Sequence, residues 1–195
     1  MPNYADINGR PMKKLQIQQY LRKLQLNDFE PAVNLATLTK LQDAHLKYIP
    51  YENFDCLNGK ITSLKRQDMF NKVIMHNRGG ICFELNGLYN WLLESLGFDV
   101  TSYSARFIDK METYQLRRHR VMCVTLGEKR YLTDVGVNSE SPRVPLEIVE
   151  GLIQSDGISQ YKFTCSEFWG WLLWQKERGK IWKRLFGFTE EPQID

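Results

Sequence analysis

The first half of the chain places apolar residues three and four positions apart, which is the spacing of one face of an α-helix. Ser63 is a favourable N-cap, and Gly79 and Gly80 are residues that end helices. Glycine at position 97 is likewise expected to terminate a helix in the left-handed conformation. The pattern predicts four helices, over residues 13–26, 37–48, 63–78 and 82–96.

After Gly97 the pattern changes to short runs rich in β-branched and aromatic residues, which are typical of strands. A turn is expected at 127–129, between two of them. The strands are predicted over 100–108, 118–126, 130–135, 160–165 and 168–174. We therefore predict an α+β protein with a helical domain over residues 1–97 and a β domain over residues 98–195.

Composition adds limits to this picture. The chain has 195 residues, of which 43% are hydrophobic and 25% charged, as in an ordinary globular protein. The net charge of +3 does not indicate nucleic acid as a partner. The apolar run 169–174 is too short to span a bilayer, and the first residues lack a signal-peptide pattern. We expect a cytoplasmic protein without a membrane partner, whose four widely spaced cysteines are reduced.

Cys82 has the local context of a nucleophile. It follows Arg78-Gly79-Gly80 and opens a predicted helix, where unpaired N–H groups and the helix dipole favour a thiolate. The same N–H groups could stabilise an oxyanion. The alternative is that Cys82 is a small buried apolar residue and the glycines form an ordinary loop. Local context alone leaves both open.

A thiolate nucleophile needs a base, and the chain has three histidines. His45 lies on an apolar helical stripe, where a hydrogen-bonded structural histidine is the better interpretation. His76 lies near a predicted helix end and is interpreted as a solvent-facing or capping residue. His119 begins a strand whose predicted neighbour carries Asp134, so it is the best candidate for the base.

The turn between these two strands decides whether His119 and Asp134 share a face. Paired residues of an antiparallel hairpin have a constant index sum, and a two-residue turn within 126–129 makes that sum odd, as it is for 119 and 134. A three-residue loop would place the two side chains on opposite faces. An aspartate beside the imidazole could orient it as in a catalytic triad, but a structural hydrogen bond is the alternative.

Other clusters give weaker indications. The sequence has no metal-ligand spacing, so we expect no metal. Arg117, Arg118 and Arg120 are interpreted as a solvated strand edge in preference to a phosphate site. The tryptophans of the run 169–174 are interpreted as core or as an inter-domain contact in preference to a ligand patch.

Three segments together resemble the arylamine N-acetyltransferase family. Residues 78–86, RGGICFELN, resemble the family signature around its acetyl-accepting cysteine. Residues 49–55, IPYENFD, resemble its Ile-Pro-Phe-Glu-Asn-Leu-Asp block, and residues 131–136, YLTDVG, resemble its aspartate-bearing strand. Residues 188–192 also match a block that closes the second domain of the family.

The resemblance implies a helical first domain and a β-barrel second domain, with a cysteine-protease-like triad at their junction. It implies that Cys82 accepts acetyl from acetyl-coenzyme A and passes it to an arylamine or hydrazine in a ping-pong reaction. His119 would be the general base and acid, and Asp134 the orienting residue. Substrate-binding positions would be Tyr51, Phe83 and Val137, and site-supporting positions Arg78, Glu52 and Asn86. We further expect Arg78 to pair with Glu52.

Two departures from the family pattern affect these expectations. The family commonly has Gly-Phe-Gly where this chain has Gly136-Val137-Asn138, so the acceptor pocket is expected to differ. The chain also ends at Asp195, where the third domain of the family, which helps to cover the cleft and bind coenzyme, would begin.

Alternative functions share these residues. One is a thiol acyl hydrolase or amide-forming acyltransferase that uses the same triad with a different acceptor. Another is a non-catalytic binding relic. An apolar surface left uncovered by a missing domain could also drive self-association.

Overall fold

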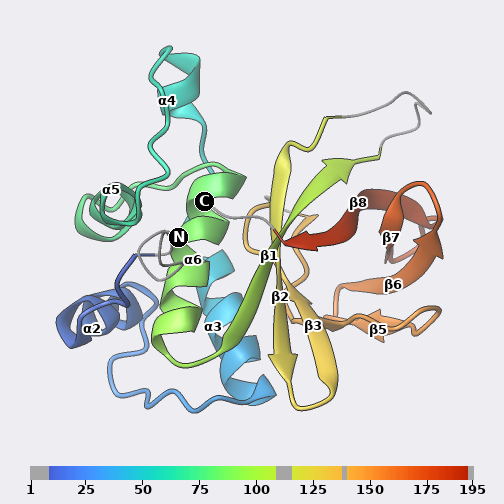
Figure 1. Ribbon diagram of the computed structural model, residues 1–195, viewed down its shortest axis with the longest axis horizontal. Coiled ribbons are helices and arrows are strands. Elements are labelled where there is room, and N and C mark those ends of the chain that lie inside the picture. The colour runs from blue at the N-terminus through green and yellow to red at the C-terminus, as the bar shows by residue number, and fades with distance from the viewer. Residues whose placement is uncertain (1–8, 109–115, 138–139, 193–195) are drawn as a thin grey trace, which may run out of the picture.

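The computed structural model describes residues 9–108, 116–137 and 140–192. Helices form the first part of the chain and strands the second, and the two parts lie side by side (Figure 1). The strands form one sheet that curls into a barrel-like shape. This confirms the predicted α+β class, with a helical region followed by a barrel-like β region.

The helices are α2 (Lys14–Lys23), α3 (Leu35–Tyr48), α4 (Phe54–Leu57), α5 (Arg66–Phe70), the π-helical turn η1 (Asn71–Met75) and α6 (Cys82–Ser95). The apolar stripe of α6 is fully buried, so this helix is the centre of the helical part. Gly97 follows it with a φ of 92°, in the left-handed conformation that glycine adopts without strain. The predictions for α2, α3 and α6 are therefore confirmed to within a few residues.

The third predicted helix is wrong in both its bounds and its type. It begins at Arg66 instead of Ser63, because the Ser63 hydroxyl bonds the Asp68 carboxylate at 2.6 Å instead of capping a helix. It widens into η1 and ends at Met75, with His76 as its C-cap, so Gly79 and Gly80 are not its terminators. Periodicity cannot distinguish a π-turn from α-helix over so few residues, and π-turns often mark functional sites.

The strands are β1 (Asp99–Phe107), β2 (His119–Leu126), β3 (Lys129–Thr133), β4 (Leu146–Glu147), β5 (Gln154–Ser155), β6 (Ser159–Ser166), β7 (Gly170–Glu177) and β8 (Lys183–Pro192). Their order in the sheet is β4-β3-β2-β1-β8-β7-β6-β5. All seven neighbouring pairs are antiparallel. The last strand thus inserts between β1 and β7, which local sequence patterns did not predict.

The run 168–174 was predicted as strand, and its tryptophans as core or as an inter-domain contact, and only part of this is correct. Gly170–Glu177 is a strand, but Trp169 precedes it in a turn. Leu172 and Leu173 are buried, whereas Trp171 and Trp174 are half-buried. Trp171 packs against the buried cluster inside the sheet that also holds Leu173, whereas a register shift after Leu173 places Trp174 opposite Lys162 and Arg184.

β2 belongs to two hydrophobic cores at once. Met122 and Val124 point toward the helices and pack with the apolar face of α6. Val121 and Cys123 point to the other side, into the interior of the curled sheet. The strand therefore docks α6 against the sheet and fixes the position of the residues at its own start. The division into domains at residue 97 stays a prediction, although helix does change to strand between Ser95 and Asp99.

Each of the four cysteines is free: Cys56 and Cys165 are exposed, and Cys82 and Cys123 are buried. This agrees with the expectation of reduced thiols. Within the described ranges, no helix combines the length and apolar character that crossing a bilayer would need.

Candidate active site

Cys82 is the first residue of α6, and the backbone before it packs closely against the segment that begins at Pro50. A Cβ atom on Gly79 would lie 2.0 Å from the Pro50 carbonyl oxygen, so only glycine allows this approach. A single bridge between Tyr51 and Gly80 and the bond from the Glu52 N–H to the Gly80 carbonyl, 3.0 Å long, hold the two segments together. Backbone contacts thereby fix the start of α6.

Glu84 caps this helix from within its first turn. Its carboxylate accepts from the N–H of Ile81 at 2.9 Å and is buried to 3% exposure. A buried carboxylate needs a cationic partner, and the Lys72 ammonium donates to it at 2.8 Å. Lys72 comes from η1, so the π-turn is tied directly to the turn that carries Cys82.

Lys72 and Arg78 share acidic partners on the preceding segment. Lys72 lies 2.9 Å from Asp55, and Arg78 donates to Glu52 through Nε at 2.9 Å and Nη2 at 2.6 Å. The predicted Arg78–Glu52 pair therefore forms. Sequence reasoning missed Lys72, Asp55 and Glu84, although a Glu three residues after the N-cap position, Ile81, was a visible capping signal.

His119 and Asp134 meet at the start of β2 and just after β3. Nε2 of His119 lies 2.6 Å from Oδ2 of Asp134, and both side chains are fully buried. Leu126 pairs with Lys129 in the register of β2 and β3, so the turn has two residues. This is the condition under which the sequence placed the two side chains on one face, and the prediction is confirmed.

Asn86 links this pair to the helix of Cys82, four residues after the cysteine. Its Nδ2 donates to Oδ1 of Asp134 at 2.8 Å, and its Oδ1 accepts from the Val135 N–H at 2.9 Å. The N–H of Gly136 gives the same Asp134 oxygen a second donor at 2.8 Å. Both carboxylate oxygens of Asp134 are thus occupied, which fixes its orientation toward His119.

The imidazole of His119 is charged over the neutral pH range. Burial opposes its protonation, but the Asp134 carboxylate and the Cys82 thiol outweigh burial and raise the pKa of His119 to about 9. The Cys82 thiol donates to the Arg118 carbonyl at 3.5 Å, and the buried Nδ1 of His119 has no hydrogen-bond partner among the described residues. Of the two ring nitrogens, Nε2 is thus the one engaged by Asp134 and Nδ1 the one without a partner there.

Of the three predicted substrate-binding residues, Tyr51 has an electrostatic interaction with Cys82. Its burial, together with the nearby Cys82 and Cys56 thiols, raises the pKa of the phenol, and 38% of the residue is exposed. Phe83 follows Cys82 and is half-buried. Val137 packs into the interior of the sheet and donates its N–H to Ser141 at 2.8 Å. Their roles toward a substrate stay predictions.

The remaining histidines and arginines partly depart from expectation. His76 is exposed at the end of η1, as predicted. His45 is buried between the Tyr20 and Tyr89 rings, but among the described residues neither of its nitrogens has a hydrogen-bond partner, so it is not a satisfied histidine.

Arg120 is buried and donates to the Ser102 hydroxyl at 2.8 Å, so it is not part of a solvated edge. The alternation along β2 turns its side chain inward toward α6.

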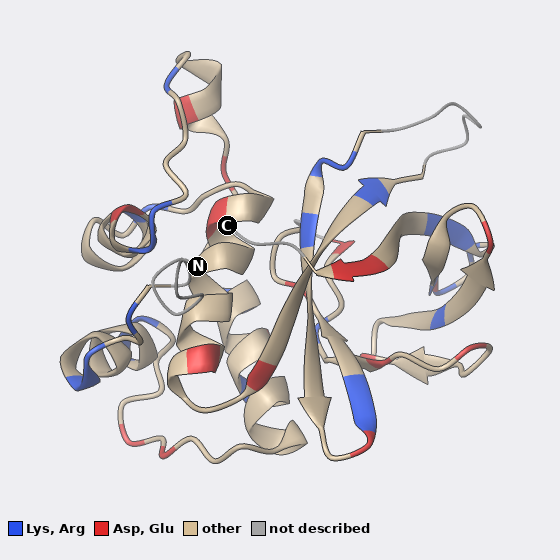
Figure 2. Cartoon of the chain, viewed as in Figure 1, with Lys and Arg blue, Asp and Glu red and all other residues tan. Residues whose placement is uncertain are grey.

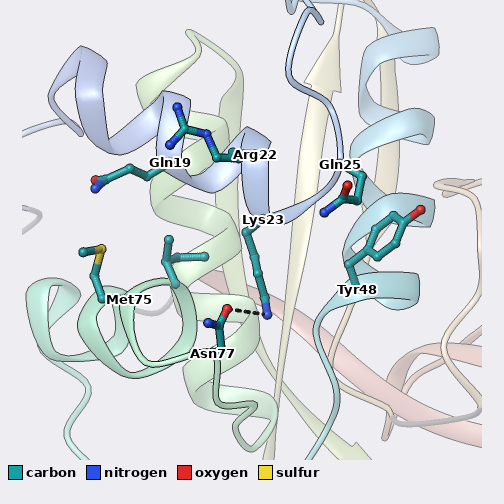
Figure 3. Close-up of a pocket in the computed structure, with 8 residues that line it drawn as sticks. Gln19, Arg22, Lys23, Gln25, Tyr48, Met75 and Asn77 are labelled. Atoms are coloured by element: carbon teal, nitrogen blue, oxygen red, sulfur yellow. Dashed lines mark hydrogen bonds between the residues drawn. The ribbon is translucent and has the colours of Figure 1, made fainter.

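A separate pocket lies between α2, the end of α3 and η1 (Figure 3). Its volume is about 420 Å³, and Lys23 donates across it to Asn77 at 3.1 Å. Its lining is distinct from Cys82, His119 and Asp134, and consists of Gln19, Arg22, Lys23, Gln25, Tyr48, Ile74, Met75 and Asn77. The described part of the chain holds no group of three or more His, Cys, Asp or Glu side chains arranged for a metal ion.

Sequence comparison places this geometry in a known family. A family profile described as N-acetyltransferase matches residues 34–195. The arylamine N-acetyltransferase of Escherichia coli is 32% identical over 167 residues, which are 84% of this chain and 59% of that protein. The enzyme of the same name from Mycolicibacterium smegmatis is 33% identical over 180 residues, 89% of this chain and 64% of that protein.

Structure comparison agrees. The arylamine N-acetyltransferase of Salmonella typhimurium superposes with a TM-score of 0.86 at 27% identity, over 93% of this chain and 65% of that chain. The M. smegmatis enzyme gives 0.85 at 32% identity, over 91% of this chain and 66% of that chain. The chain thus spans about three fifths of the length of these curated relatives. On the profile match, the sequence relatives and the shared fold, it belongs to the arylamine N-acetyltransferase family.

Proposed function

We propose that this protein is an acetyl-coenzyme A-dependent N-acetyltransferase whose nucleophile is Cys82. The observation that carries the proposal is the buried His119–Asp134 pair, 2.6 Å long, joined through Asn86 to the helix that Cys82 opens. Family membership supports acetyl-coenzyme A as the cosubstrate. Arylamines or hydrazines are the proposed acceptors.

In the first half-reaction, Cys82 reacts as the thiolate of a thiolate–imidazolium pair, its proton being held on Nδ1 of His119, and attacks the acetyl carbonyl carbon of acetyl-coenzyme A. A carbon–sulfur bond forms to Cys82 and the bond to the coenzyme sulfur breaks. The departing coenzyme thiolate receives the proton from His119. A His119 pKa of about 9 supports this step, because the imidazolium that pairs with the thiolate is stable at neutral pH.

In the second half-reaction the amine nitrogen attacks the acetyl group on Cys82. His119 takes the proton that the nitrogen loses, and the Cys82 sulfur leaves as the thiolate. The product is the N-acetyl amine and the enzyme returns to its first state. Asp134 stays ionised throughout and holds Nε2 of the imidazole, so that Nδ1 is the nitrogen that serves the sulfur.

Intact mass spectrometry after brief exposure to acetyl-coenzyme A without an amine tests this proposal. We expect one added acetyl group on the native protein and none on Cys82→Ala. Cys165→Ala, which removes an exposed thiol, is the matched control and should be acetylated like the native protein. An unmodified native protein, with its thiols shown to be reduced, would leave the binding-relic alternative.

The acceptor is a second question, because one relative carries a different name. Proansamycin X synthase of Amycolatopsis mediterranei is 31% identical over 188 residues, 93% of this chain and 70% of that protein. We therefore keep an acyltransferase or hydrolase with the same triad as the second candidate. Release of acetyl from Cys82 in buffer as fast as with an arylamine present would favour hydrolysis.

A further inference from the structure

On the outer face of β6, β7 and β8, cationic side chains pack against indole rings. Lys162, Trp174 and Arg184 lie directly opposite one another on the three strands. Lys176 lies two residues further along β7, and Trp182 immediately precedes β8. The inward face of the same strands is apolar and buried, with Tyr161, Phe163, Leu173 and Phe186. We call the outward set, Lys162, Trp174, Lys176, Trp182 and Arg184, the cation–indole face.

The indole rings hold the cationic groups in place. The Lys162 ammonium lies 4.7 Å from the ring centre of Trp182 and 5.9 Å from that of Trp174. The Arg184 guanidinium lies 5.8 Å from Trp174, and the Lys176 ammonium 6.0 Å from Trp182. Cation–π contacts of this kind restrain side chains that would otherwise be mobile, so their charges are concentrated on one surface.

The β7–β8 connection adds charge and apolar surface beside this face. The nine residues 176–184, KERGKIWKR, contain five Lys or Arg and a single Glu, an excess larger than the net charge of +3 of the whole chain. Glu177 pairs with Lys180 at 2.7 Å and with Lys183 at 3.4 Å, and Lys183 also pairs with Glu140. The net charge of the whole chain therefore does not reveal the basic excess of residues 176–184.

An exposed isoleucine lies at the end of each of the two neighbouring hairpins, β5–β6 and β7–β8. Ile181 is 87% exposed and Ile158, in the β5–β6 turn, is 58% exposed. A shallow pocket of about 330 Å³ joins the two hairpin ends, with Ile158, Lys176 and Arg178 in its lining. In Figure 1 these strands lie at the side of the molecule away from the helices, and in Figure 2 basic segments colour β6 and β8 there.

We propose that the cation–indole face and the two hairpin ends dock on an anionic lipid surface. Lys and Arg would contact lipid phosphates and carboxylates, the tryptophans would lie at headgroup depth, and Ile158 and Ile181 would enter the acyl boundary. The indole faces are already covered by cations, which makes them poor platforms for stacked bases and favours a membrane over nucleic acid. The sequence-based expectation of no membrane partner considered only spanning segments.

Vesicle co-sedimentation with the full chain tests this inference. The probes are phosphatidylcholine vesicles with and without about 30 mol % phosphatidylserine, at low and physiological salt. We expect binding to the anionic vesicles alone, weakened by salt. Lys176→Glu with Arg178→Glu should weaken binding by at least ten-fold, because each surface cation contributes roughly five-fold. Ile181→Ser should weaken binding without changing its salt dependence.

A charge-matched control is Lys14→Glu with Lys40→Glu, two exposed lysines of the helical part. It should bind vesicles nearly as the native protein does, and circular dichroism with the Cys82 alkylation rate should show that every variant is folded. Three results would overturn the inference: equal binding to neutral and anionic vesicles, equal losses in both double variants, or tighter binding to a single-stranded oligonucleotide. None of these readouts depends on acetyl transfer, so the proposed enzyme activity can fail independently.

Discussion

Nε2 of His119 lies 2.6 Å from Oδ2 of Asp134, although the two residues do not face each other directly across the strands. Met122 faces Thr133 in the register of β2 and β3, so His119 and Asp134 are offset by two positions and share a face. A one-residue slip of this hairpin would move one of them to the other face. The hairpin register is therefore a determinant of the candidate site.

Protonated His119 should stabilise the fold. Its folded pKa of about 9 lies above the ordinary 6.5, so its contribution is complete below pH 6.5 and is lost as the pH rises through 9. The maximum contribution is about 3 kcal/mol. We expect the free energy of unfolding of the native protein to fall relative to that of His119→Gln between these two pH values. Urea unfolding across this range measures the difference. If the free energies of unfolding of the two proteins change in parallel with pH, His119 is not protonated in the folded protein.

His45 should destabilise the fold in acid. Burial lowers the pKa of His45 to about 3. As the pH drops below 6.5, the unfolded chain therefore binds a proton at His45 that the folded protein does not bind, which favours unfolding. This term costs about 1.4 kcal/mol per pH unit. His45→Leu should remove it and also remove a buried polar group without a hydrogen-bond partner among the described residues. The exposed His76→Gln is the control, and acid-induced unfolding followed by circular dichroism should shift for His45→Leu alone.

Asn86→Ala should damage acetylation of Cys82 more than it damages the fold. The change removes a donor to Asp134 and the acceptor of the Val135 N–H, which costs about 2 kcal/mol of stability. We expect the rate of Cys82 acetylation to fall roughly 100-fold, as for a misplaced catalytic group. Asn90→Ala, one turn further along α6, removes a bond to Glu94 and is the control. Similar rates for the two variants would argue against a positioning role.

Lys72→Met should leave the buried Glu84 carboxylate without its 2.8 Å partner. Breaking a buried ion pair in this way costs about 3 kcal/mol, measured by urea unfolding. Lys72→Arg should retain most of the stability, and Glu84→Gln added to Lys72→Met should recover part of the loss, because the uncompensated charge disappears. The exposed Lys65→Met serves as the control. A double variant less stable than either single one would show that the pair does not act through charge.

Local patterns predicted the site better than they predicted the sheet. The start of α6 at Cys82 and the pairing of His119 with Asp134 follow from short-range signals, namely a helical stripe and the length of one turn. The position of β8 between β1 and β7 depends on pairing of residues far apart in sequence, such as Phe107 with Phe186, which no local period reveals. Long-range pairing is the property that sequence patterns encode least.

Individual side chains were missed for similar reasons. Arg120 was expected in solvent because it is charged, but alternation along β2 turns it toward α6, where it reaches Ser102. Lys72 was overlooked because its acidic partners, Asp55 and Glu84, come from two different segments. Both errors concern charged groups whose burial is decided by tertiary contacts and not by the residue type.

Gly136 is in close contact with the first turn of α6, because a Cβ atom at this position would lie 2.8 Å from Cα of Cys82. The helix can reach its final position only when the segment that follows β3 and carries Gly136 lies against it. Helices form from local contacts and faster than sheets of long-range pairing. We therefore expect the thiol of Cys82 to become protected late in folding. Its protection from an alkylating reagent during refolding would time the docking of sheet on helix, independently of any substrate.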